Sequence, residues 1–539
     1  MSAYKTKSTP CDRKAGRAGA NALRALAVCT GVAAAVATLA PAYGQGQPVD
    51  AGVERQLTTA SADGPAALLR ALDDVLRANP ALASTPARAA ALARVAGAPV
   101  SGFIGASVPV YRGITDRITA AAPPASAQAV RQAVASELGR MAAADVRPLP
   151  PAPAQTTLAP PGAPQLGGPG YRVGSFTIYP DIQSALIFDD NIYATKTSRR
   201  SDWLGTISPK LSVESNWERH SLTAEVQTDL TGYARSPHEN TVDWNANIEG
   251  RIDASQQTQI LLGATAIASH EDRSSPDAVN GITPTPYMES NGYAGVIHRY
   301  GDFSIRLGGA IEHLTFSNVD GANGIINNQD RNRTRYTFGT LVRYEANPAF
   351  RPFVELLGDI RRYNSRYDDF GYARSSDGYR VSAGALFRIS TSVRGDFSVG
   401  VMSRNAEDSR FKTTTTPSFD GSLRWQATSG TALILYTDRS MEETTLSGSP
   451  GYIYTVVGGR VEQRLTQDLT GIARVAWGRS DFIQATRVDN DADMSVGLRY
   501  RLTPKVTLGV DYRYTLRDSN VTLARYDRNE VYFRLGSQF

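Results

Sequence analysis

Residues 505–517 read KVTLGVDYRYTLR, and this stretch decides the fold because its apolar and polar side chains alternate along its whole length. Polar residues such as Asp511, Arg513 and Arg517 occupy one face. Side chains that alternate with period two predict a β-strand with a different environment on each face. The apolar face carries Val506, Leu508, Val510, Tyr512, Tyr514 and Leu516.

The same alternation recurs along the chain after residue 170, for example at 222–230, 303–315, 379–389 and 531–539. A soluble β-sandwich would show it too, so alternation alone does not decide between a sandwich and a membrane barrel. The connections between strands do decide, because long polar connections alternate with tight turns. The long ones are expected near 190–201, 234–241, 270–287, 317–332, 363–377, 404–417, 441–450, 480–490 and 518–527.

Nine long connections and eight tight turns predict eighteen antiparallel strands, with sixteen as the alternative count. Short turns at one end and long loops at the other are typical of an outer-membrane β-barrel. In hydrocarbon every backbone N–H and C=O must be paired within the protein, so a spanning sheet has to close on itself. We therefore expect an all-β transmembrane barrel over residues 171–539.

Charged side chains on the polar faces of these strands are expected to line the lumen. On the lipid side each would cost about 2–4 kcal/mol at mid-membrane. Such groups either select or bind a solute, or pair with one another and rigidify the wall. The candidates are Arg306, Glu312, Arg380, Arg388, Arg474, Asp511, Arg513, Arg517 and Arg534.

Two segments precede the predicted barrel. Residues 148–170 are rich in Pro and Gly and predict an extended linker. Residues 45–147 are rich in Ala, with apolar residues at helical spacing, and predict either a small helical periplasmic domain or partly disordered helices. The clearest apolar face is expected at Leu68, Leu69, Leu72, Val75 and Leu76.

Residues 1–44 have the pattern of a secretory signal peptide, with basic residues before an apolar run over 22–40 and small residues after it. A retained membrane anchor is the alternative, which the short, Ala-rich run disfavours. Both cysteines, Cys11 and Cys29, fall inside this segment, so the mature chain would hold no thiol and no disulfide.

The net charge of +5 also comes from the signal segment, which carries six basic residues and one acid. The remaining chain is neutral, which argues against a nucleic-acid partner.

The start of the predicted barrel resembles the "putative β-barrel porin 2" family of outer-membrane proteins. The resemblance rests on Asp189-Asp190-Asn191 and on Asp202 and Pro209 in their local sequence. The terminal Phe539, preceded by alternating apolar residues, resembles the signal read by the barrel-assembly machinery, although Ser537 departs from that pattern. The resemblance implies a passive pore in the outer membrane of a Gram-negative cell. An even number of strands returns the chain to its starting side, so the N-terminal region and Phe539 are both expected in the periplasm.

Three functions are consistent with that resemblance. The first is a conduit for exopolysaccharide secretion, in which residues 45–147 dock a periplasmic polysaccharide-export protein. The second is a general or solute-selective diffusion porin. The third is a plugged structural or adhesive barrel that displays its long loops.

Enzymatic function is not expected, because no catalytic constellation stands out and a chain without Cys offers no thiol nucleophile. The run Asp489, Asp491 and Asp493 could suggest Ca²⁺, but Met494 and Tyr500 stand where a calcium loop requires Gly and Glu. We interpret the run as inward acids at the start of a strand, and we expect no metal and no cofactor.

Overall fold

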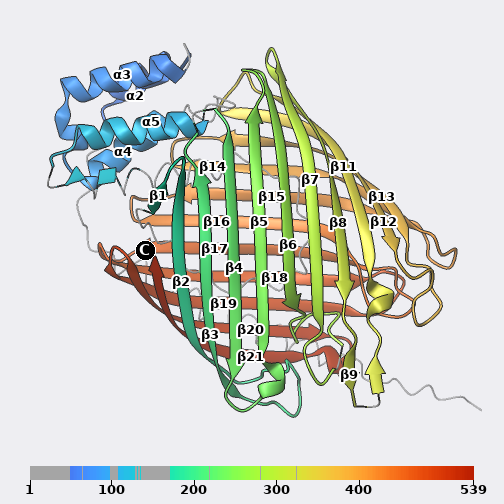
Figure 1. Cartoon of the computed structure of the whole chain (residues 1–539). Helices are drawn as coiled ribbons and strands as arrows, with labels where there is room; N and C mark the ends of the chain where they lie inside the picture. Colours follow the sequence, from blue (N-terminus) through green and yellow to red (C-terminus); the bar gives the residue numbers. More distant parts are fainter. Residues whose placement is uncertain are drawn as a thin grey trace, which may run out of the picture.

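The computed structural model describes residues 49–62, 65–97, 107–124, some positions between 126 and 134, and 170–538 except 218, 280 and 323. A helical unit comes first and a large closed sheet follows it (Figure 1). No helix among these residues is long and apolar enough to cross a membrane. The predicted signal peptide, nearly all of the linker and Phe539 lie outside the described residues.

The helical unit has a core of its own. Its elements are α2 (Ala51–Ala62), α3 (Pro65–Ala78), η1 (Pro80–Ala83), α4 (Pro86–Gly97) and α5 (Ser107–Ala120). Four of the five residues expected on the apolar face of α3 are buried, and Leu69 packs against the same core. The described helices therefore pack together around one core. Fully buried in this core are Leu57, Leu68, Leu72, Leu92, Ile114, Ile118, Val130 and Val134.

The sheet is a ring of eighteen antiparallel strands within the described residues, which confirms the predicted count and excludes sixteen. Each strand pairs with its neighbours in sequence, and β2 pairs with both β3 and β21, so the ring has no free edge. The short strand β1 (Tyr171–Val173) adds only to the end of β2. The eighteen are β2 (Phe176–Asp189), β3 (Asp202–Ser215), β4 (Ser221–Tyr233), β5 (Thr241–Asp253), β6 (Thr258–His270), β7 (Pro286–Tyr300), β8 (Phe303–Phe316), β11 (Arg333–Tyr344), β12 (Phe350–Tyr363), β13 (Ser376–Arg388), β14 (Val393–Ala406), β15 (Thr414–Gln426), β16 (Thr431–Glu442), β17 (Tyr452–Arg464), β18 (Leu469–Phe482), β19 (Val488–Thr503), β20 (Val506–Ser519) and β21 (Tyr526–Gln538).

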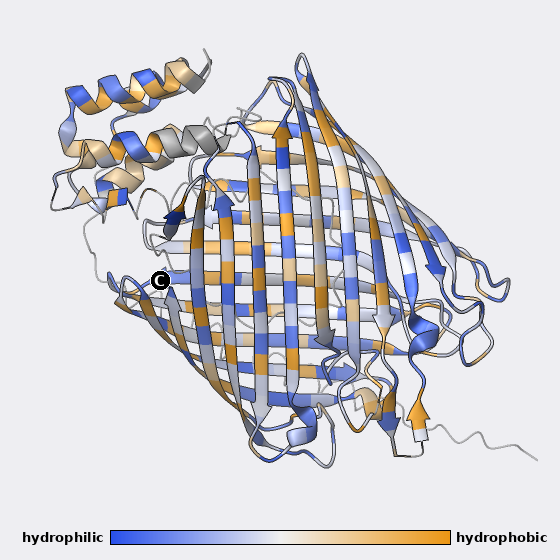
Figure 2. Cartoon of the chain, in the orientation of Figure 1, coloured by the Kyte–Doolittle hydropathy of each residue, from blue (hydrophilic) through white to orange (hydrophobic). Residues whose placement is uncertain are grey.

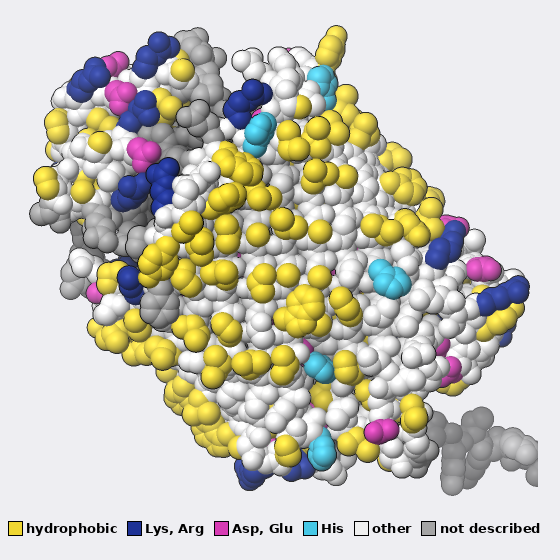
Figure 3. Space-filling model, viewed as in Figure 1, with side chains coloured by type: hydrophobic (Ala, Val, Ile, Leu, Met, Phe, Trp, Pro, Cys, Tyr) yellow, Lys and Arg dark blue, Asp and Glu magenta, His cyan; other side chains and the backbone are white. Residues whose placement is uncertain are grey.

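Strand β20 shows how the sequence divides between lipid and lumen. Val510 and Tyr512 are 47% and 44% exposed, whereas Asp511 and Arg513 between them are 2% and 7% exposed. Residues that pair directly across an antiparallel ladder lie on the same face. The register therefore extends the lipid-facing and lumen-facing sets of β20 to the other strands of the ring. On the side of the barrel in view, hydrophobic side chains are spread over the outer face and few charged ones lie between its two ends (Figures 2 and 3). The barrel is therefore apolar outside and polar inside.

Long loops gather at one end of the barrel and short turns at the other, as the connection lengths predicted. Three loops contain short elements: η3 (Pro237–Glu239) in L2, the hairpin β9 (Val319–Gly321) and β10 (Gly324–Ile326) with η4 (Gln329–Arg331) in L4, and η5 (Thr522–Ala524) in L9. We number the long loops L1 (190–201), L2 (234–240), L3 (271–285), L4 (317–332), L5 (364–375), L6 (407–413), L7 (443–451), L8 (483–487) and L9 (520–525).

Candidate solute passage through the barrel

The charged residues expected to line the lumen all lie on the inward faces of their strands. The strand register assigns these faces, because a residue lies on the same face as its direct partner on each neighbouring strand. Asp511, for example, shares the inward face with Gly497 and Tyr532. Their contacts show mainly pairing within the wall: Arg534 Nε lies 2.9 Å from Asp511 Oδ2, and Arg380 Nη2 lies 3.2 Å from Glu355 Oε2. A role in binding solute stays a prediction for Arg306, Glu312, Arg380, Arg388, Arg474, Asp511, Arg513, Arg517 and Arg534.

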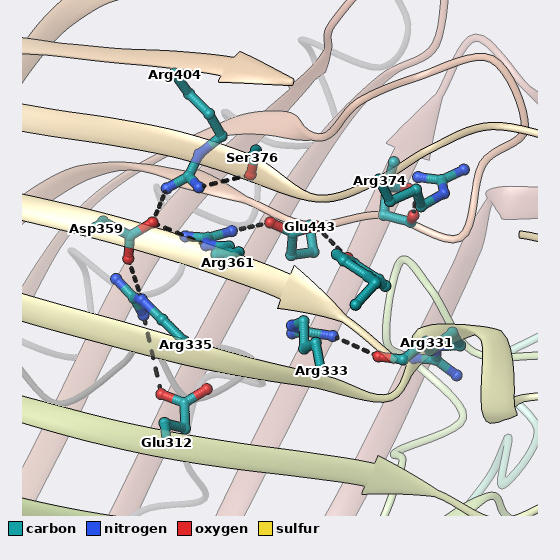
Figure 4. A network of polar contacts seen from close by, with 12 residues as sticks. Glu312, Arg331, Arg333, Arg335, Asp359, Arg361, Arg374, Ser376, Arg404 and Glu443 are labelled. Atoms are coloured by element: carbon teal, nitrogen blue, oxygen red, sulfur yellow. Dashed lines mark hydrogen bonds and ion pairs between the residues drawn. The ribbon is translucent and has the colours of Figure 1, made fainter. Parts of the chain in front are cut away.

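One buried ion network lies near the loop end of strands β11–β14 (Figure 4). Asp359 accepts hydrogen bonds from Arg335, from Arg361 at 3.1 Å and from Arg404 at 2.6 Å. Arg361 also pairs with Glu443 at the start of L7. Although burial disfavours its charged form, the guanidinium groups of Arg361, Arg333 and Arg404 lower the pKa of Glu443 to about 2. The network therefore ties the barrel wall to a loop at the mouth.

A second network covers the wall formed by strands β19–β21. Arg513 Nη2 lies 2.7 Å from Asp493 Oδ2, and Arg517 Nε lies 2.7 Å from Asp491 Oδ1. Arg528 Nη1 lies 3.7 Å from Asp189 Oδ2 on β2 and thereby bridges the first and last strands. Because buried charges are costly unless paired, this pairing lets acids and bases share the lumen wall.

Loop L3 crosses the mouth of the barrel. In the ring, L3 lies between the fifth and sixth strands and L7 between the thirteenth and fourteenth, so the two loops start on nearly opposite sides. The Asp277 carboxylate nevertheless accepts hydrogen bonds from Thr444 Oγ1 at 2.8 Å and from the Thr445 N–H at 3.0 Å, both in L7. L3 and L7 thus meet across the opening.

Further contacts hold L3 to the loops beside it. Arg273 donates to Glu239 in L2 through Nη2 at 2.7 Å and Nε at 3.0 Å. Glu271 accepts from Arg331 Nη1 in L4 at 2.9 Å, and the Ile282 N–H donates to a backbone carbonyl of L4 at 2.7 Å. Glu239 and Glu271 are 2% and 4% exposed. L3 is therefore fastened to three loops rather than lying free above the pore.

The inner face is most exposed near the short turns of strands β3–β5, whereas near the turns of β19 and β20 it is buried, with Arg499 at 4% and Asp511 at 2% exposed. Glu214 and Glu249 are exposed on the inner face in the turn half, and the pair Lys210–Glu225 is about one-third exposed. In the loop half Arg361 is only 4% and Asp493 only 1% exposed. The most exposed part of the inner wall therefore lies on strands β3–β5 below the mouth, while L3 and the first buried network lie at the loop end.

Inward charges are distributed unevenly around the ring. Strands β2–β7, the acidic wall, present ten acids and three bases: Asp181, Asp189, Asp202, Glu214, Glu225, Asp229, Asp243, Glu249, Asp253 and Glu289 against Lys210, Arg251 and Arg299. Strands β8 and β11–β15, the basic wall, present eleven bases and five acids: Arg306, Arg333, Arg335, Arg343, Arg351, Arg361, Arg380, Arg388, Arg394, Arg404 and Arg424 against Glu312, Glu355, Asp359, Asp396 and Asp420. Opposite charges on two walls of one lumen set a transverse electric field.

A family comparison identifies this barrel. The model of the family described as "Putative beta-barrel porin 2" matches residues 163–539, which is more than half of the chain and includes the whole barrel. The chain belongs to this porin family. It is thus an outer-membrane β-barrel pore, and a porin is a channel rather than an enzyme.

Solved structures that this porin matches include OpdK of Pseudomonas aeruginosa with vanillate, at 9% identity over 67% of this chain and 99% of that chain, with a TM-score of 0.37. OccK9 (OpdG) of Pseudomonas aeruginosa matches at 13% identity over 68% and 98%, with a TM-score of 0.38. OccAB3 of Acinetobacter baumannii matches at 10% identity over 67% and 99%, with a TM-score of 0.37. No curated protein matches the chain. Similarity at this level carries no argument about solutes.

Asn191 and Asp190, two of the residues on which the family resemblance rests, fasten loop L1 where the barrel closes. Asn191 is fully buried, and its Nδ2 donates to the carbonyls of Thr195 and Asp527, each at 2.8 Å. Asp190 accepts from the N–H of Asn529 at 2.7 Å. Among the other motif residues, Asp189 Oδ1 accepts from the Asn191 N–H at 2.7 Å, Asp202 accepts from the N–H groups of Trp203 and Arg235, and Pro209 faces the lipid on β3.

Asn191→Ala is expected to destabilise the porin by about 1–3 kcal/mol, because it removes both Nδ2 hydrogen bonds and leaves the Asp527 carbonyl with only the Arg199 guanidinium as donor. The measurement is equilibrium urea unfolding in detergent, followed by the heat-modifiable gel shift. Asn364→Ala in the exposed part of L5 is the matched control and should change stability by less than about 0.5 kcal/mol. Equal stability of the two variants would show that the motif does not fasten the closure.

The acids Asp489, Asp491 and Asp493 lie on the inward face at the start of β19, as interpreted from the sequence. Each pairs with an arginine: Asp489 with Arg487, and the other two with the arginines of the second network. In the described part of the chain no group of three or more His, Cys, Asp or Glu is arranged to hold a metal ion.

The contacts of L3 are the part of this site that sequence reasoning missed. The sequence located L3 as a long connection near 270–287, but it did not identify Asp277, Arg273 or Glu271 as fastening residues. The partner of Asp277 is 167 residues away in sequence, and nothing local to either loop marks that contact. The four charged residues of this loop, Glu271, Asp272, Arg273 and Asp277, were the only available signal.

Proposed function

We propose that this porin lets small polar solutes diffuse across the outer membrane, through a mouth narrowed by L3 and past walls of opposite charge. The single observation that carries the proposal is the attachment of L3 to L7 on the opposite side of the opening. A passage narrowed in this way suits solutes of a few sugar or amino-acid units. A transverse field orients polar molecules and disfavours apolar ones, which would need to displace ordered water.

The proposal is tested by liposome swelling with the purified full chain and uncharged sugars of increasing size. We expect monosaccharides to enter readily and the rate to fall steeply between disaccharides and tetrasaccharides. Equal rates for all these sizes, or no swelling with any of them, would contradict the proposal. The second outcome would favour the plugged, loop-displaying barrel instead.

Exopolysaccharide secretion stays the alternative prediction from the sequence. A polymer would have to pass the position of L3, so export requires that loop to swing aside. Deleting the gene and finding unchanged surface polysaccharide would count against export and would leave the diffusion proposal intact. The signal peptide, recognition of the C-terminal segment by the barrel-assembly machinery, the periplasmic location of residues 45–147 and their docking of an export protein also remain predictions.

The exposed acids of the turn half are expected to tune ion selectivity. The double variant Glu214→Gln, Glu249→Gln removes two negative charges from the wettest part of the acidic wall. We expect the permeability ratio of K⁺ to Cl⁻ to fall roughly twofold, because a more positive wall attracts anions. The measurement is the reversal potential of planar-bilayer currents under a KCl gradient. Asp302→Asn, in a short turn, is the control, and an unchanged ratio in the double variant would show that this wall does not face the ion path.

A further inference from the structure

Tyr436 lies flat on the inner wall at the middle of β16. It shares the inward face with Gly458, its direct partner on β17, while Leu435 beside it is 42% exposed on the lipid side. A Cβ atom at Gly458 would lie 2.8 Å or less from Cε1, Cζ and the hydroxyl oxygen of the tyrosine, so the ring covers the glycine. One face of the ring is therefore against the strand, and the half-buried residue presents its other face to the lumen.

Polar groups flank this ring along the row of directly paired residues. On one side Tyr436 pairs with Ser422 of β15, and Ser422 pairs with Asp396 of β14. Ser422 is exposed, and its hydroxyl donates to the Asp396 carboxylate at 2.6 Å. On the other side, beyond Gly458, Arg474 Nη2 of β18 donates to the Tyr436 hydroxyl at 3.3 Å. The ring is thus a flat apolar surface with an acid near one edge and a base at the other.

An ion pair that is open to the lumen lies next to the ring, toward the short turns. Arg460 and Glu462 follow Gly458 on the inward face of β17, and Arg460 Nη2 lies 2.8 Å from Glu462 Oε1. Their side chains are 34% and 30% exposed, whereas those of Arg513 and Asp493 in the second network are 8% and 1% exposed. The pair therefore offers guanidinium donors and a carboxylate acceptor to a solute in the lumen.

Toward the loops, the surroundings of the ring are closed. Tyr436 packs there against a cluster of four inward side chains, each between 5% and 8% exposed. These are Tyr452, Tyr454, Val456 and Phe482. A solute therefore reaches the ring from the middle of the lumen and from the turn side, where the ion pair lies.

We propose that Tyr436 and the polar groups around it bind one pyranose ring of a sugar. The axial C–H groups of a glucose-type ring form an apolar face, which the negatively charged face of an aromatic ring attracts. The equatorial hydroxyls project from the rim of the sugar, where the carboxylates accept and the guanidinium groups donate hydrogen bonds. The inference rests on the proposed diffusion of small polar solutes and names the solute class for which the passage holds a site.

Tyr293 provides a comparison within the same lumen. Its ring also lies over a glycine, because a Cβ atom at Gly263 of β6 would lie 2.2 Å from Cε1 of the tyrosine. Tyr293 is on β7, the sixth strand of the ring, and Tyr436 is on the thirteenth, so the two lie on nearly opposite walls. The direct partners of Tyr293 are Gly263 and Ala310, which carry no hydrogen-bonding side chain. The polar row therefore distinguishes Tyr436.

The test is a titration of planar-bilayer currents through the purified full chain with D-glucose and with the acyclic polyol D-sorbitol. A bound sugar obstructs the ion current, so glucose should reduce it saturably, and sorbitol should require at least about fivefold more for the same reduction. Tyr436→Leu should raise the half-saturating glucose concentration at least about fivefold, the loss expected for one aromatic contact. Tyr436→Phe keeps the ring and should change it less than about twofold. Tyr293→Leu is the matched control and should leave it unchanged.

Three outcomes would overturn this site. Equal reduction by glucose and sorbitol would show that no sugar face is recognised. An unchanged half-saturating concentration in Tyr436→Leu would place the binding elsewhere. An equal rise in Tyr293→Leu would show that loss of any inward tyrosine has the same effect. In each case liposome swelling with sugars would still support diffusion, whereas the absence of both current and swelling would contradict the proposed function itself.

A second variant keeps the test decisive if Tyr436→Leu does not fold. The heat-modifiable gel shift establishes the folded state of each variant before its currents are recorded. Glu462→Gln changes a side chain that is 30% exposed and removes a carboxylate acceptor from the site. It should raise the half-saturating glucose concentration at least about twofold. A folded Glu462→Gln variant with an unchanged value would show that the ion pair does not contact the sugar.

Discussion

Deleting residues 274–284 from L3 and joining the ends with two glycines is expected to raise single-channel conductance on the order of three- to tenfold. The loop crosses the opening and is held on the far side by Thr444 and Thr445. An eighteen-stranded barrel without it would present a wide aqueous mouth. The strands that flank L3 are paired along their whole length, so the wall should survive the deletion.

A point variant tests whether conductance is limited by the attachment of L3 or by its volume. Asp277→Ala keeps the loop but removes its attachment to L7, so we expect frequent transitions between two conductance levels rather than one high level. Asp302→Ala in a short turn removes an acid from the opposite end of the barrel and should leave the trace unchanged. An unchanged conductance after the full deletion would mean that something other than L3 limits the passage.

The fold was predictable from the sequence because lipid imposes a strict rule on every strand. Hydrocarbon on one side and water on the other force side chains to alternate, so Val510 and Asp511 reveal their faces without knowledge of any partner. The alternation of long and short connections then fixes the strand count. The period-two rule also separates lumen charges from lipid-facing residues, which is why Arg513 and Arg517 could be placed on the inner wall.

Partners across the lumen and between loops were not predictable in this way. Arg361 pairs with Glu443 only because the strand register and the path of L7 bring them together, and 82 residues separate them. The faces of aromatic residues near strand ends were not predictable either. Trp203, Tyr300 and Tyr379 face the lipid, as residues that anchor a barrel at the membrane boundary should. Tyr526 lies on the inward face and is only 7% exposed. A residue type near a strand end indicates a boundary, but only the register assigns its face.

Arg361→Ala is expected to destabilise the porin by about 3–5 kcal/mol, the range found when one partner of a buried ion pair is removed. Arg361 is 4% exposed and lies between Asp359 and Glu443. Its loss leaves a carboxylate of the wall and one of L7 short of a counter-charge. The measurement is urea unfolding in detergent. Arg479→Ala removes a half-exposed, lipid-side pair with Asp481 and should cost less than about 1 kcal/mol.

The pH dependence of the free energy of unfolding tests the pair of Arg361 and Glu443 independently. The pKa of Glu443 is lowered to about 2 in the folded barrel, below its usual value. A lowered carboxyl pKa stabilises the fold above the unfolded-state pKa, near 4.3, and that stabilisation is lost as pH falls through about 2. Wild-type stability should therefore decline between these two values, and Glu443→Gln should remove part of that decline.

The double variant Arg361→Met, Glu443→Gln shows why Arg361→Ala loses stability. The loss comes either from the missing hydrogen bond or from a buried carboxylate without a counter-charge. Replacing both members of a buried pair is often nearly neutral, whereas removing one is costly. We therefore expect the double variant to recover at least half of the stability lost in Arg361→Ala. If it is as unstable as the single variant, Asp359 rather than Glu443 depends on Arg361. In that case Arg335 and Arg404, which also bind Asp359, do not compensate for the missing guanidinium.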